Sequence, residues 1–223
     1  MTKSKPLAHN VTELLAQADL MRRRFVAAVR AAQEGGVSFI DRAAPIDQVL
    51  LDKARLFSTR QLLLAALPPG GVLAEIGVDQ GAFSRFIIDT LKPSKLHLFD
   101  IAPERIDPAN LASAFADGLA QLHIGDSSTN LSRFPEGHFN MIYVDGDHLY
   151  DGVVRDITVA ESKLKPGGYM VLNDYTAWSP ASMSKCGVAK AANEFINRRR
   201  WPVVALALQG AGYYDIALQK PGG

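Results

Sequence analysis

The chain has 223 residues, 48% of them hydrophobic, and its 24 Lys and Arg against 23 Asp and Glu give a net charge of +1. At about 150 residues per domain, this length predicts one large domain or one domain with an appendage. The composition excludes a disordered chain, and the near-neutral charge lacks the basic excess of a general nucleic-acid binder. The single cysteine, Cys186, excludes an internal disulfide and a thiolate metal cluster.

Signals for export or membrane insertion are not found in the sequence. The first ten residues contain no apolar core of signal-peptide length. The longest apolar runs, at 62–67 and 203–208, are far shorter than the ~20 residues of a membrane-spanning helix. We therefore expect a cytoplasmic protein without membrane contact.

Two helical patterns precede the Pro-Pro-Gly-Gly segment at 68–71. In the first, apolar residues recur at helical spacing from 14 to 32, and a double glycine ends the pattern. The second begins near Pro45, a residue suited to a first helical turn, and reaches Leu67. We expect residues 1–67 to form a helical appendage and residues 68–223 to form one sheet domain.

Beyond residue 71, short β-rich runs alternate with helical stretches. The predicted parallel strands are 72–78, 95–101, 121–125, 139–144 and 169–172, and the predicted helices are 81–91, 104–118, 149–164 and 184–200. Two further strands, 203–208 and 213–219, flank a glycine-containing loop and predict an antiparallel hairpin. The pattern predicts an α/β fold, a Rossmann-like doubly wound sheet of seven strands that is mostly parallel and covered on both faces.

Ligands of such sheets bind at the carboxyl ends of the strands, so these ends are the candidate site. The first strand ends in Glu75-x-Gly77-x-x-x-Gly81 and leads into a helix. The glycines allow the backbone to approach a ligand closely, and the helix N-terminus offers free N–H groups. The spacing is neither that of a dinucleotide site nor that of a phosphate loop. A tight turn between strand and helix is the alternative interpretation.

The next two strands also end in polar residues. Asp100 is placed to accept hydrogen bonds from two vicinal ribose hydroxyls, and Gly125-Asp126-Ser127 to contact an adenine ring and its amino group. Helix capping by the two carboxylates is the alternative. Because these residues follow one another at matching strand ends, the set favours a nucleoside ligand.

Three further polar residues end the fourth and fifth strands. Asp145 follows one strand, and Asn173 and Asp174 follow its neighbour. Adjacent strands lie ~4.8 Å apart, so these oxygens are expected to meet and to suit Mg²⁺ or a similar cation. Alternatively, Asp145 serves the nucleoside ligand or a loop, and Asp174 caps the segment after it.

Residues near this cluster are candidates for the acceptor side. His148 begins a predicted helix, and a histidine at the mouth of a crevice suits a general base; an exposed helix residue is the alternative. Tyr175 and Trp178 are candidates for the pocket wall or for core packing.

Taken together, the motifs resemble class I S-adenosylmethionine-dependent methyltransferases over residues 70–220. The resemblance rests on Glu75-x-Gly77-x-x-x-Gly81, Asp100, Gly125-Asp126-Ser127, Leu164-Lys-Pro-Gly-Gly168 and the terminal hairpin. Tyr143-Val-Asp145-Gly-Asp-His148-x-Tyr150-Asp-Gly152-Val and Asn173-Asp174-Tyr175 are similar to the small-molecule O-methyltransferase branch, which includes metal-dependent enzymes that act on sugar hydroxyls.

The resemblance implies methyl transfer from S-adenosylmethionine to a hydroxyl of a small molecule, with residues 1–67 as a lid over the catalytic domain. It assigns the cofactor to Glu75, Gly77, Gly81, Asp100, Gly125, Asp126, Ser127 and Asp145.

The same resemblance assigns a catalytic centre to Asp145 and His148. Asp145, Asn173 and Asp174 would bind Mg²⁺ or a similar divalent cation, which lowers the pKa of the acceptor hydroxyl, and His148 would take its proton. Relatives often carry an acidic residue where Asn173 stands, and a neutral amide weakens the site.

Two other functions stay open. One is metal-independent N- or O-methylation, with Asp145 on the nucleoside or the acceptor. The other is nucleic-acid binding or modification through the arginine clusters at 22–24 and 198–200, which solvated helix faces explain more simply. The acceptor and a homo-oligomeric state are not determined by the sequence.

Overall fold

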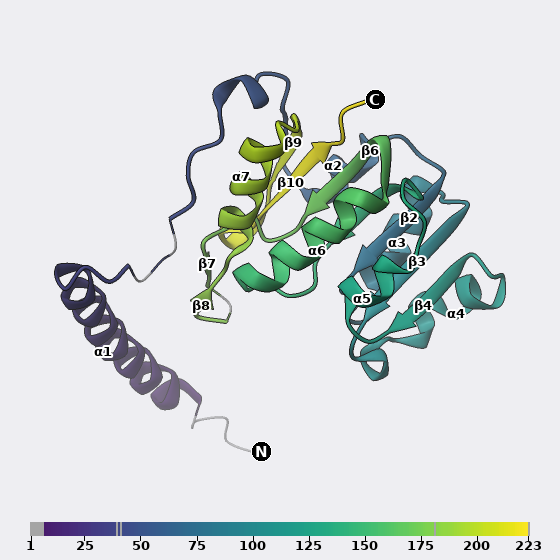
Figure 1. Cartoon of the computed structure of the whole chain (residues 1–223). Coiled ribbons are helices and arrows are strands. Elements are labelled where there is room, and N and C mark those ends of the chain that lie inside the picture. Colours follow the sequence, from purple (N-terminus) through teal and green to yellow (C-terminus); the bar gives the residue numbers. More distant parts are fainter. Residues whose placement is uncertain (1–6, 39, 41, 181, 223) are drawn as a thin grey trace, which may run out of the picture. The chain divides into compact units, whose positions relative to one another are not determined.

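The structure, a computed structural model, describes residues 7–38, 40, 42–180 and 182–222, with side chains for all of these except 7–10 and 211. The contacts divide the chain into two compact units, Met1–Asp41 and Arg42–Gly223. The first unit contains the helix α1 (Leu7–Glu34), coloured purple in Figure 1. At 1.5 Å per residue, its 28 residues span about 42 Å. It ends at the double glycine, as predicted.

The second unit is built on an eight-stranded sheet. Its order is β1-β9-β10-β6-β5-β2-β3-β4, and β7 and β8 form a separate two-stranded ribbon. The strands are β1 (Arg55–Phe57), β2 (Val72–Ile76), β3 (Lys95–Asp100), β4 (Ala120–Ile124), β5 (Phe139–Val144), β6 (Leu164–Leu172), β7 (Trp178–Ser179), β8 (Ser184–Lys185), β9 (Val203–Leu208) and β10 (Tyr214–Gln219).

Helices connect the strands. They are α2 (Arg60–Ala65), α3 (Ala82–Leu91), α4 (Pro108–Ala116), α5 (Ser127–Ser132), α6 (Tyr150–Lys163) and α7 (Val188–Arg199), with the short 3₁₀ turns η1 (Gln48–Leu50), η2 (Pro103–Arg105) and η3 (Gly210–Gly212). Strand β10 pairs antiparallel with both β6 and β9, while the other pairs of the sheet are parallel. The predicted Rossmann-like, doubly wound sheet with a terminal hairpin is therefore confirmed, with eight strands instead of the predicted seven because β1 pairs with β9 at its edge.

The predicted helix from Pro45 to Leu67 is wrong. This segment contains η1, then β1, then α2, because β1 adds a parallel strand to the edge of the sheet beside β9. A new helix starts after Thr59, whose hydroxyl accepts a hydrogen bond from the Leu62 N–H at 3.2 Å. Residues 42–67 thus belong to the compact unit that holds the sheet.

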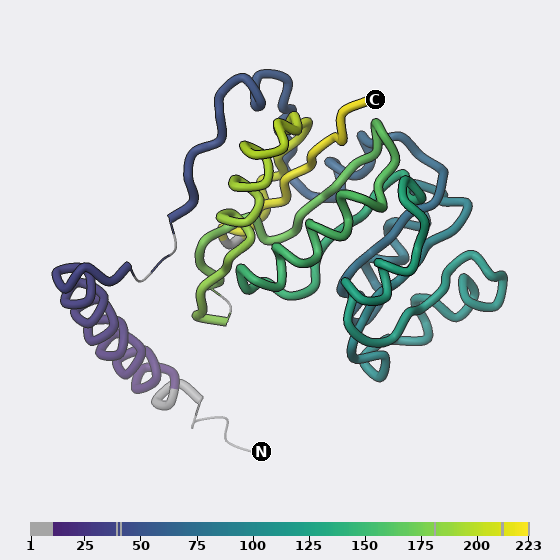
Figure 2. Tube along the Cα trace, in the orientation of Figure 1, coloured from purple at the N-terminus to yellow at the C-terminus, as the bar shows by residue number. Residues whose placement is uncertain are grey.

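Each face of the sheet carries its own hydrophobic core. On one face, α5, α6 and α7 bury side chains such as Leu131, Ile157 and Phe195. On the other, α2, α3 and α4 bury Leu63 and Ile87, among others. Figure 2 shows α6 and α7 side by side over the sheet. This double covering explains why the strands are apolar on both faces.

None of the helices that the structure describes is long and apolar enough to cross a lipid bilayer.

Candidate functional site

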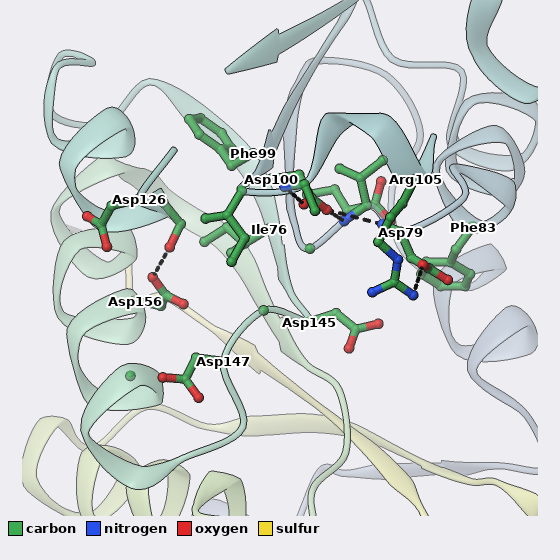
Figure 3. Close-up of a pocket in the computed structure, with 18 of the residues that line it drawn as sticks. Ile76, Asp79, Phe83, Phe99, Asp100, Arg105, Asp126, Asp145, Asp147 and Asp156 are labelled. Carbon is green, nitrogen blue, oxygen red and sulfur yellow. Dashed lines mark hydrogen bonds and ion pairs between the residues drawn. The ribbon is translucent and has the colours of Figure 1, made fainter. Parts of the chain in front are cut away.

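A cavity of about 870 Å³ opens at the carboxyl ends of β2, β3, β4 and β5. Seven of the predicted site residues line it: Glu75, Gly77, Asp100, Gly125, Asp126, Ser127 and Asp145. In Figure 3, Asp126 and Asp156 lie at one end of the cavity and Phe83 at the other, with Asp100 between them. The prediction that these strand ends form one pocket is confirmed. Gly81, His148, Asn173 and Asp174 do not line this cavity.

The two predicted glycines are required by the chain itself. Gly77 and Gly81 have φ of 83° and 79°, in the left-handed region that favours glycine. A Cβ at Gly77 would collide with the carbonyl oxygen of Asp145, and one at Gly81 with the side chain of Leu111. The tight turn that was the alternative interpretation is therefore present, and it brings the β2 loop onto the cavity wall.

Asp100 holds two loops together. Its Oδ2 accepts hydrogen bonds from the N–H of Val78 at 2.7 Å and of Asp79 at 3.1 Å, and its Oδ1 from the N–H of Ala102 at 2.7 Å. Burial alone would raise the pKa of Asp100, but these N–H groups outweigh it and lower the pKa below its ordinary value. These three bonds use both lone pairs of Oδ2 and one of Oδ1, so Oδ1 remains able to accept a hydroxyl donor from the cavity.

Asp126 caps a helix and also lies on the wall of the cavity. Its Oδ1 accepts hydrogen bonds from the Thr129 N–H at 2.7 Å and the Ser128 hydroxyl at 2.8 Å, so it is the N-cap of α5. These bonds, that of Thr129 first, lower the pKa of Asp126. It also lines the cavity. The short helix that it caps was not predicted.

Asp156 is a site residue that the sequence analysis missed. It lies on α6, is only 3% exposed, and its Oδ1 accepts a hydrogen bond from the Ser127 hydroxyl at 2.6 Å. Burial raises the pKa of its carboxyl group. The available signal was an acidic residue on the apolar face of a predicted helix, between Val153 and Ala160.

Glu75 is fully buried on the cavity wall. It is 1% exposed, and burial raises the pKa of its carboxyl group to about 8. Among the described residues, its Oε2 has no hydrogen-bond partner. A buried carboxyl oxygen left unpaired beside a cavity is costly for the protein alone, and it marks a place where a ligand donor fits.

Arg60, at the start of α2, was also missed, because its segment was assigned to the appendage. Its guanidinium group lies 4.1 Å from the ring centroid of Phe83, and its Nη1 lies 3.8 Å from Asp145 Oδ2. The same nitrogen donates to the Tyr143 hydroxyl at 3.4 Å. Arg60 therefore brings a positive charge to the cavity beside Glu75 and Asp145.

Asn173 lies in a buried polar network behind the cavity. Its Nδ2 donates to Asp215 Oδ1 at 3.0 Å and to the Tyr143 hydroxyl at 3.2 Å, while Tyr143 donates to Asp215 Oδ2 at 2.6 Å. Asp215 is 0% exposed, and burial raises its pKa to about 6. The Nδ2 of Asn173, whose amide oxygen was predicted as a metal ligand, is thus committed to Tyr143 and to Asp215 on the hairpin strand β10.

His148 lies between the two carboxylates predicted as metal ligands. Its Nε2 is 3.3 Å from Asp145 Oδ1 and 3.4 Å from Asp174 Oδ2, at angles that do not make a hydrogen bond with either. The contact with Asp145 raises the pKa of His148, and burial raises the pKa of Asp174. Asp145 and Asp174 are therefore close to each other as predicted, but each contacts the imidazole ring of His148.

The predicted site for Mg²⁺ is not supported. The described residues include no group of three or more His, Cys, Asp and Glu placed to hold a metal ion. The Nε2 of His148 lies within 3.4 Å of both the Asp145 and the Asp174 carboxylates, and the Nδ2 of Asn173 donates to Asp215. With a ring nitrogen against both carboxylates, the residues as placed do not offer Mg²⁺ the oxygen ligands that it prefers.

The two aromatic candidates for the acceptor wall do not line the main cavity. Tyr175 borders a separate cavity of about 390 Å³, where its hydroxyl donates to Asn193 Oδ1 at 2.6 Å. Trp178 lies in the ribbon strand β7.

The main cavity is acidic. Seven carboxyl residues line it, against three arginines: Glu75, Asp79, Asp100, Asp126, Asp145, Asp147 and Asp156, with Arg60, Arg105 and Arg155. Two arginines pair with acids of the wall, Arg105 with Asp79 at 2.5 Å and Arg155 with Asp147 at 3.9 Å. The balance of charge favours a cationic ligand.

Part of the chain is similar in sequence to known proteins. Residues 74–175, slightly under half of the chain, match a family model described as a methyltransferase domain. One curated relative, "Uncharacterized protein R132" of Acanthamoeba polyphaga mimivirus, is 36% identical over 55 residues, or 24% of each chain.

Solved structures share the fold at low identity. The pyocyanin biosynthetic protein PhzM has a TM-score of 0.55 at 16% identity, over 72% of this chain and 53% of its own. The N-methyltransferase NodS of Bradyrhizobium japonicum WM9, solved with S-adenosyl-L-homocysteine, has 0.54 at 18%, over 73% and 84%. An O-methyltransferase family protein of Burkholderia thailandensis has 0.52 at 12%, over 73% and 55%.

The chain thus spans about half the length of PhzM and about a quarter of the viral relative. At these identities, the solved structures show the fold alone. The chain has the Rossmann-like methyltransferase fold, and its residues 74–175 match a methyltransferase domain.

Proposed function

We propose that this protein transfers a methyl group from S-adenosylmethionine to a small-molecule acceptor. The observation that carries the proposal is the acidic cavity at the carboxyl ends of β2 to β5. S-adenosylmethionine has a sulfonium and an ammonium group against one carboxylate, so this lining attracts it, whereas it repels a nucleotide with several phosphates. The match to a methyltransferase domain and the S-adenosyl-L-homocysteine in NodS support the same ligand.

The methionine end of the ligand fits the group formed by Glu75, Asp145 and Arg60. The unpaired Oε2 of Glu75 accepts the ligand's ammonium group, with Asp145 nearby on the wall. Arg60 is the cation on this side of the cavity, so we assign it to the ligand's carboxylate.

The nucleoside end fits the opposite part of the cavity. Asp100 is held in its charged form by backbone N–H groups, and its Oδ1 accepts a ribose hydroxyl. Asp126, Ser127 and Asp156 lie where the adenine ring and its amino group would be placed, beside the ring of Phe99. S-adenosylmethionine supplies an activated methyl group on its sulfonium sulfur, and these residues align it for in-line displacement.

We assign the acceptor to a hydroxyl group of a small molecule, and the proton of that hydroxyl to His148. Because Nε2 of His148 faces two carboxylates, its Nδ1 is the nitrogen left to take the proton. Asp145 and Asp174 then stabilise the imidazolium that forms, in the way that a carboxylate stabilises the histidine of a catalytic triad.

Transfer without a divalent cation is the mechanism that this arrangement supports. The imidazole ring stands between the carboxylates that were predicted to hold the metal. The protein's contribution is then alignment of the two reactants, exclusion of water and removal of one proton.

The experiment is a screen for methyl transfer from S-adenosylmethionine to hydroxylated metabolites, with and without a chelator and with and without Mg²⁺. We expect transfer that chelation leaves unchanged and that His148→Ala reduces by about 10²-fold or more, while S-adenosyl-L-homocysteine binding persists. Loss of turnover on chelation, restored by Mg²⁺, would contradict the metal-free mechanism. Full turnover in His148→Ala would remove this residue as the base.

Nucleic-acid modification has weaker support. In the first arginine cluster, Arg22 and Arg23 both pair with Asp19 of the same helix. In the second, Arg199 pairs with Glu161, and Arg200 with Asp47. These ion pairs engage four of the six arginines of the two clusters and are solvated, which favours the simpler interpretation as charged helix faces.

A further inference from the structure

The helix α1 carries a heptad repeat. Apolar residues recur alternately three and four positions apart through the whole helix: Leu7, Val11, Leu14, Ala18, Met21, Phe25, Ala28 and Ala32. Alternating steps of three and four place two apolar residues in every seven, the repeat with which one helix packs along another in a coiled coil. No polar residue interrupts the series, which extends over about four heptads, the length that identifies a coiled coil in a sequence.

Three large residues of this stripe, Val11, Leu14 and Met21, are exposed in the structure. In the described part of Met1–Asp41, α1 is the one helix and no strand accompanies it. Val11, Leu14 and Met21 are 49%, 56% and 64% exposed. An amphipathic helix gains most of its stability by packing its apolar face, so this face needs a partner.

The charges of α1 favour a second copy in the opposite direction. Residues 7–20 contain two acids, Glu13 and Asp19, and no Lys or Arg. Residues 21–34 contain four arginines and one acid, Glu34, a net charge of 4 − 1 = +3. An antiparallel pair places each acidic half beside the basic half of the other helix, whereas a parallel pair would set the two basic halves together.

The sizes of the apolar residues favour the same direction. In an antiparallel pair centred between residues 19 and 20, Ala18 lies opposite Met21, and Val11 opposite Ala28. In a parallel pair, each residue of the repeat would face its own copy, and the three alanines Ala18, Ala28 and Ala32 would each leave a gap. Cores are packed to high density, and alternating large and small residues across the seam fills it more evenly.

We propose that α1 forms an antiparallel coiled coil with α1 of a second copy of this chain, and that the protein is therefore a dimer. The two-fold axis crosses the seam near residues 19 and 20, and the same surface serves both copies. This inference is independent of the cavity and of the proposed methyl transfer.

The oligomeric state of the full chain tests the proposal. Sedimentation equilibrium at micromolar concentrations is expected to give twice the 24.2 kDa of one chain. The double variant Leu14→Glu/Met21→Glu should be monomeric, because it buries charges in the seam. Leu20→Glu is the matched control: Leu20 is 50% exposed but lies outside the repeat, so this variant should remain a dimer.

A monomeric wild-type chain would overturn the proposal, and so would a dimer that persists in the Leu14→Glu/Met21→Glu variant. The thermal unfolding of the sheet unit, followed by circular dichroism, should be the same in all three proteins, because the substitutions act on α1 and not on the sheet.

Cysteine pairing tests the direction, since the native Cys186 is buried. Residues 11 and 28 lie on opposite halves of the helix, 17 positions apart, or about 25 Å. The Val11→Cys/Ala28→Cys variant should form interchain disulfides under mild oxidation, because an antiparallel pair brings these positions together. Val11→Cys alone should not. Rapid dimer formation by Val11→Cys alone would show a parallel pair and contradict the stated geometry.

Discussion

Replacement of Glu75 by Gln is predicted to stabilise the free protein and to weaken cofactor binding. The carboxyl group of Glu75 is fully buried, burial raises its pKa from 4.5 to about 8, and its Oε2 has no partner among the described residues. In the unfolded chain the same group is ionised at neutral pH. At pH values between these two pKa values, the folded protein therefore keeps a proton on Glu75 that the unfolded chain has released.

The magnitude follows from the two pKa values. A pKa that is raised on folding lowers the free energy of unfolding as the pH rises from the unfolded value towards the folded one. For values of 4.5 and about 8, the cost at pH 7 is up to about 3 kcal/mol. Gln has a similar shape and does not ionise, so Glu75→Gln should recover much of this energy at pH 7 and little of it near pH 4.

Cofactor binding should respond in the opposite sense. With a pKa of about 8, Glu75 is about 90% protonated at pH 7, and pairing with an ammonium group requires it to ionise. Binding of S-adenosyl-L-homocysteine should therefore release close to one proton from the wild-type site at pH 7. Glu75→Gln should bind about tenfold or more weakly and release none.

Calorimetric titration in buffers of different ionisation enthalpy measures this proton directly, and urea unfolding at several pH values measures the stability. Equal proton release in the wild type and in Glu75→Gln would refute the reasoning. So would a variant that is less stable than the wild type at pH 7 but binds the ligand normally.

Three further predictions concern the same unit. Asp100→Asn should weaken S-adenosyl-L-homocysteine binding by at least about tenfold. It should also lower the unfolding free energy by about 1–3 kcal/mol, because an amide replaces an acceptor of three N–H groups. Calorimetry showing unchanged affinity would contradict the ribose assignment. Gly77→Ala should cost more stability than Gly70→Ala in thermal unfolding, since both have positive φ but only the first Cβ meets the Asp145 carbonyl; equal losses would show that the collision is relieved. Burial, with His123 nearby, lowers the pKa of His97 to about 4. The free energy of unfolding should therefore fall by ~1 kcal/mol as the pH drops from 7 to 5, and His97→Asn should reduce this fall. An identical pH dependence in the variant would exclude His97 as its cause.

The sequence predicted those parts of the site that depend on local pattern. Glu75, Asp100, Asp126 and Asp145 each end a strand of strong apolar character, and parallel strands necessarily bring such ends to one edge. The sheet and its hairpin were predictable for the same reason, because each strand and its boundary glycines lie close together in the chain.

The missed residues depend on contacts between distant segments. Arg60 reaches the cavity only because the short strand β1 pairs with β9, about 150 positions later in the chain. This pairing overrides the helical pattern of the segment that contains Arg60. The direction of the Asn173 amide is set by Asp215 on the terminal hairpin. The metal prediction finds no support in the structure for that reason: strand ends show which residues meet, but not which way an amide or an imidazole ring points once its neighbours are in place.

The most direct test of the central claim is a calorimetric titration of the protein with S-adenosyl-L-homocysteine, set beside identical titrations with ATP and NAD. The acidic cavity predicts one bound S-adenosyl-L-homocysteine per chain, with ATP and NAD binding at least about 100-fold more weakly because their phosphates meet excess carboxylates. Absence of S-adenosyl-L-homocysteine binding, or equal binding of the phosphate-bearing nucleotides, would contradict the account of this protein as a methyltransferase.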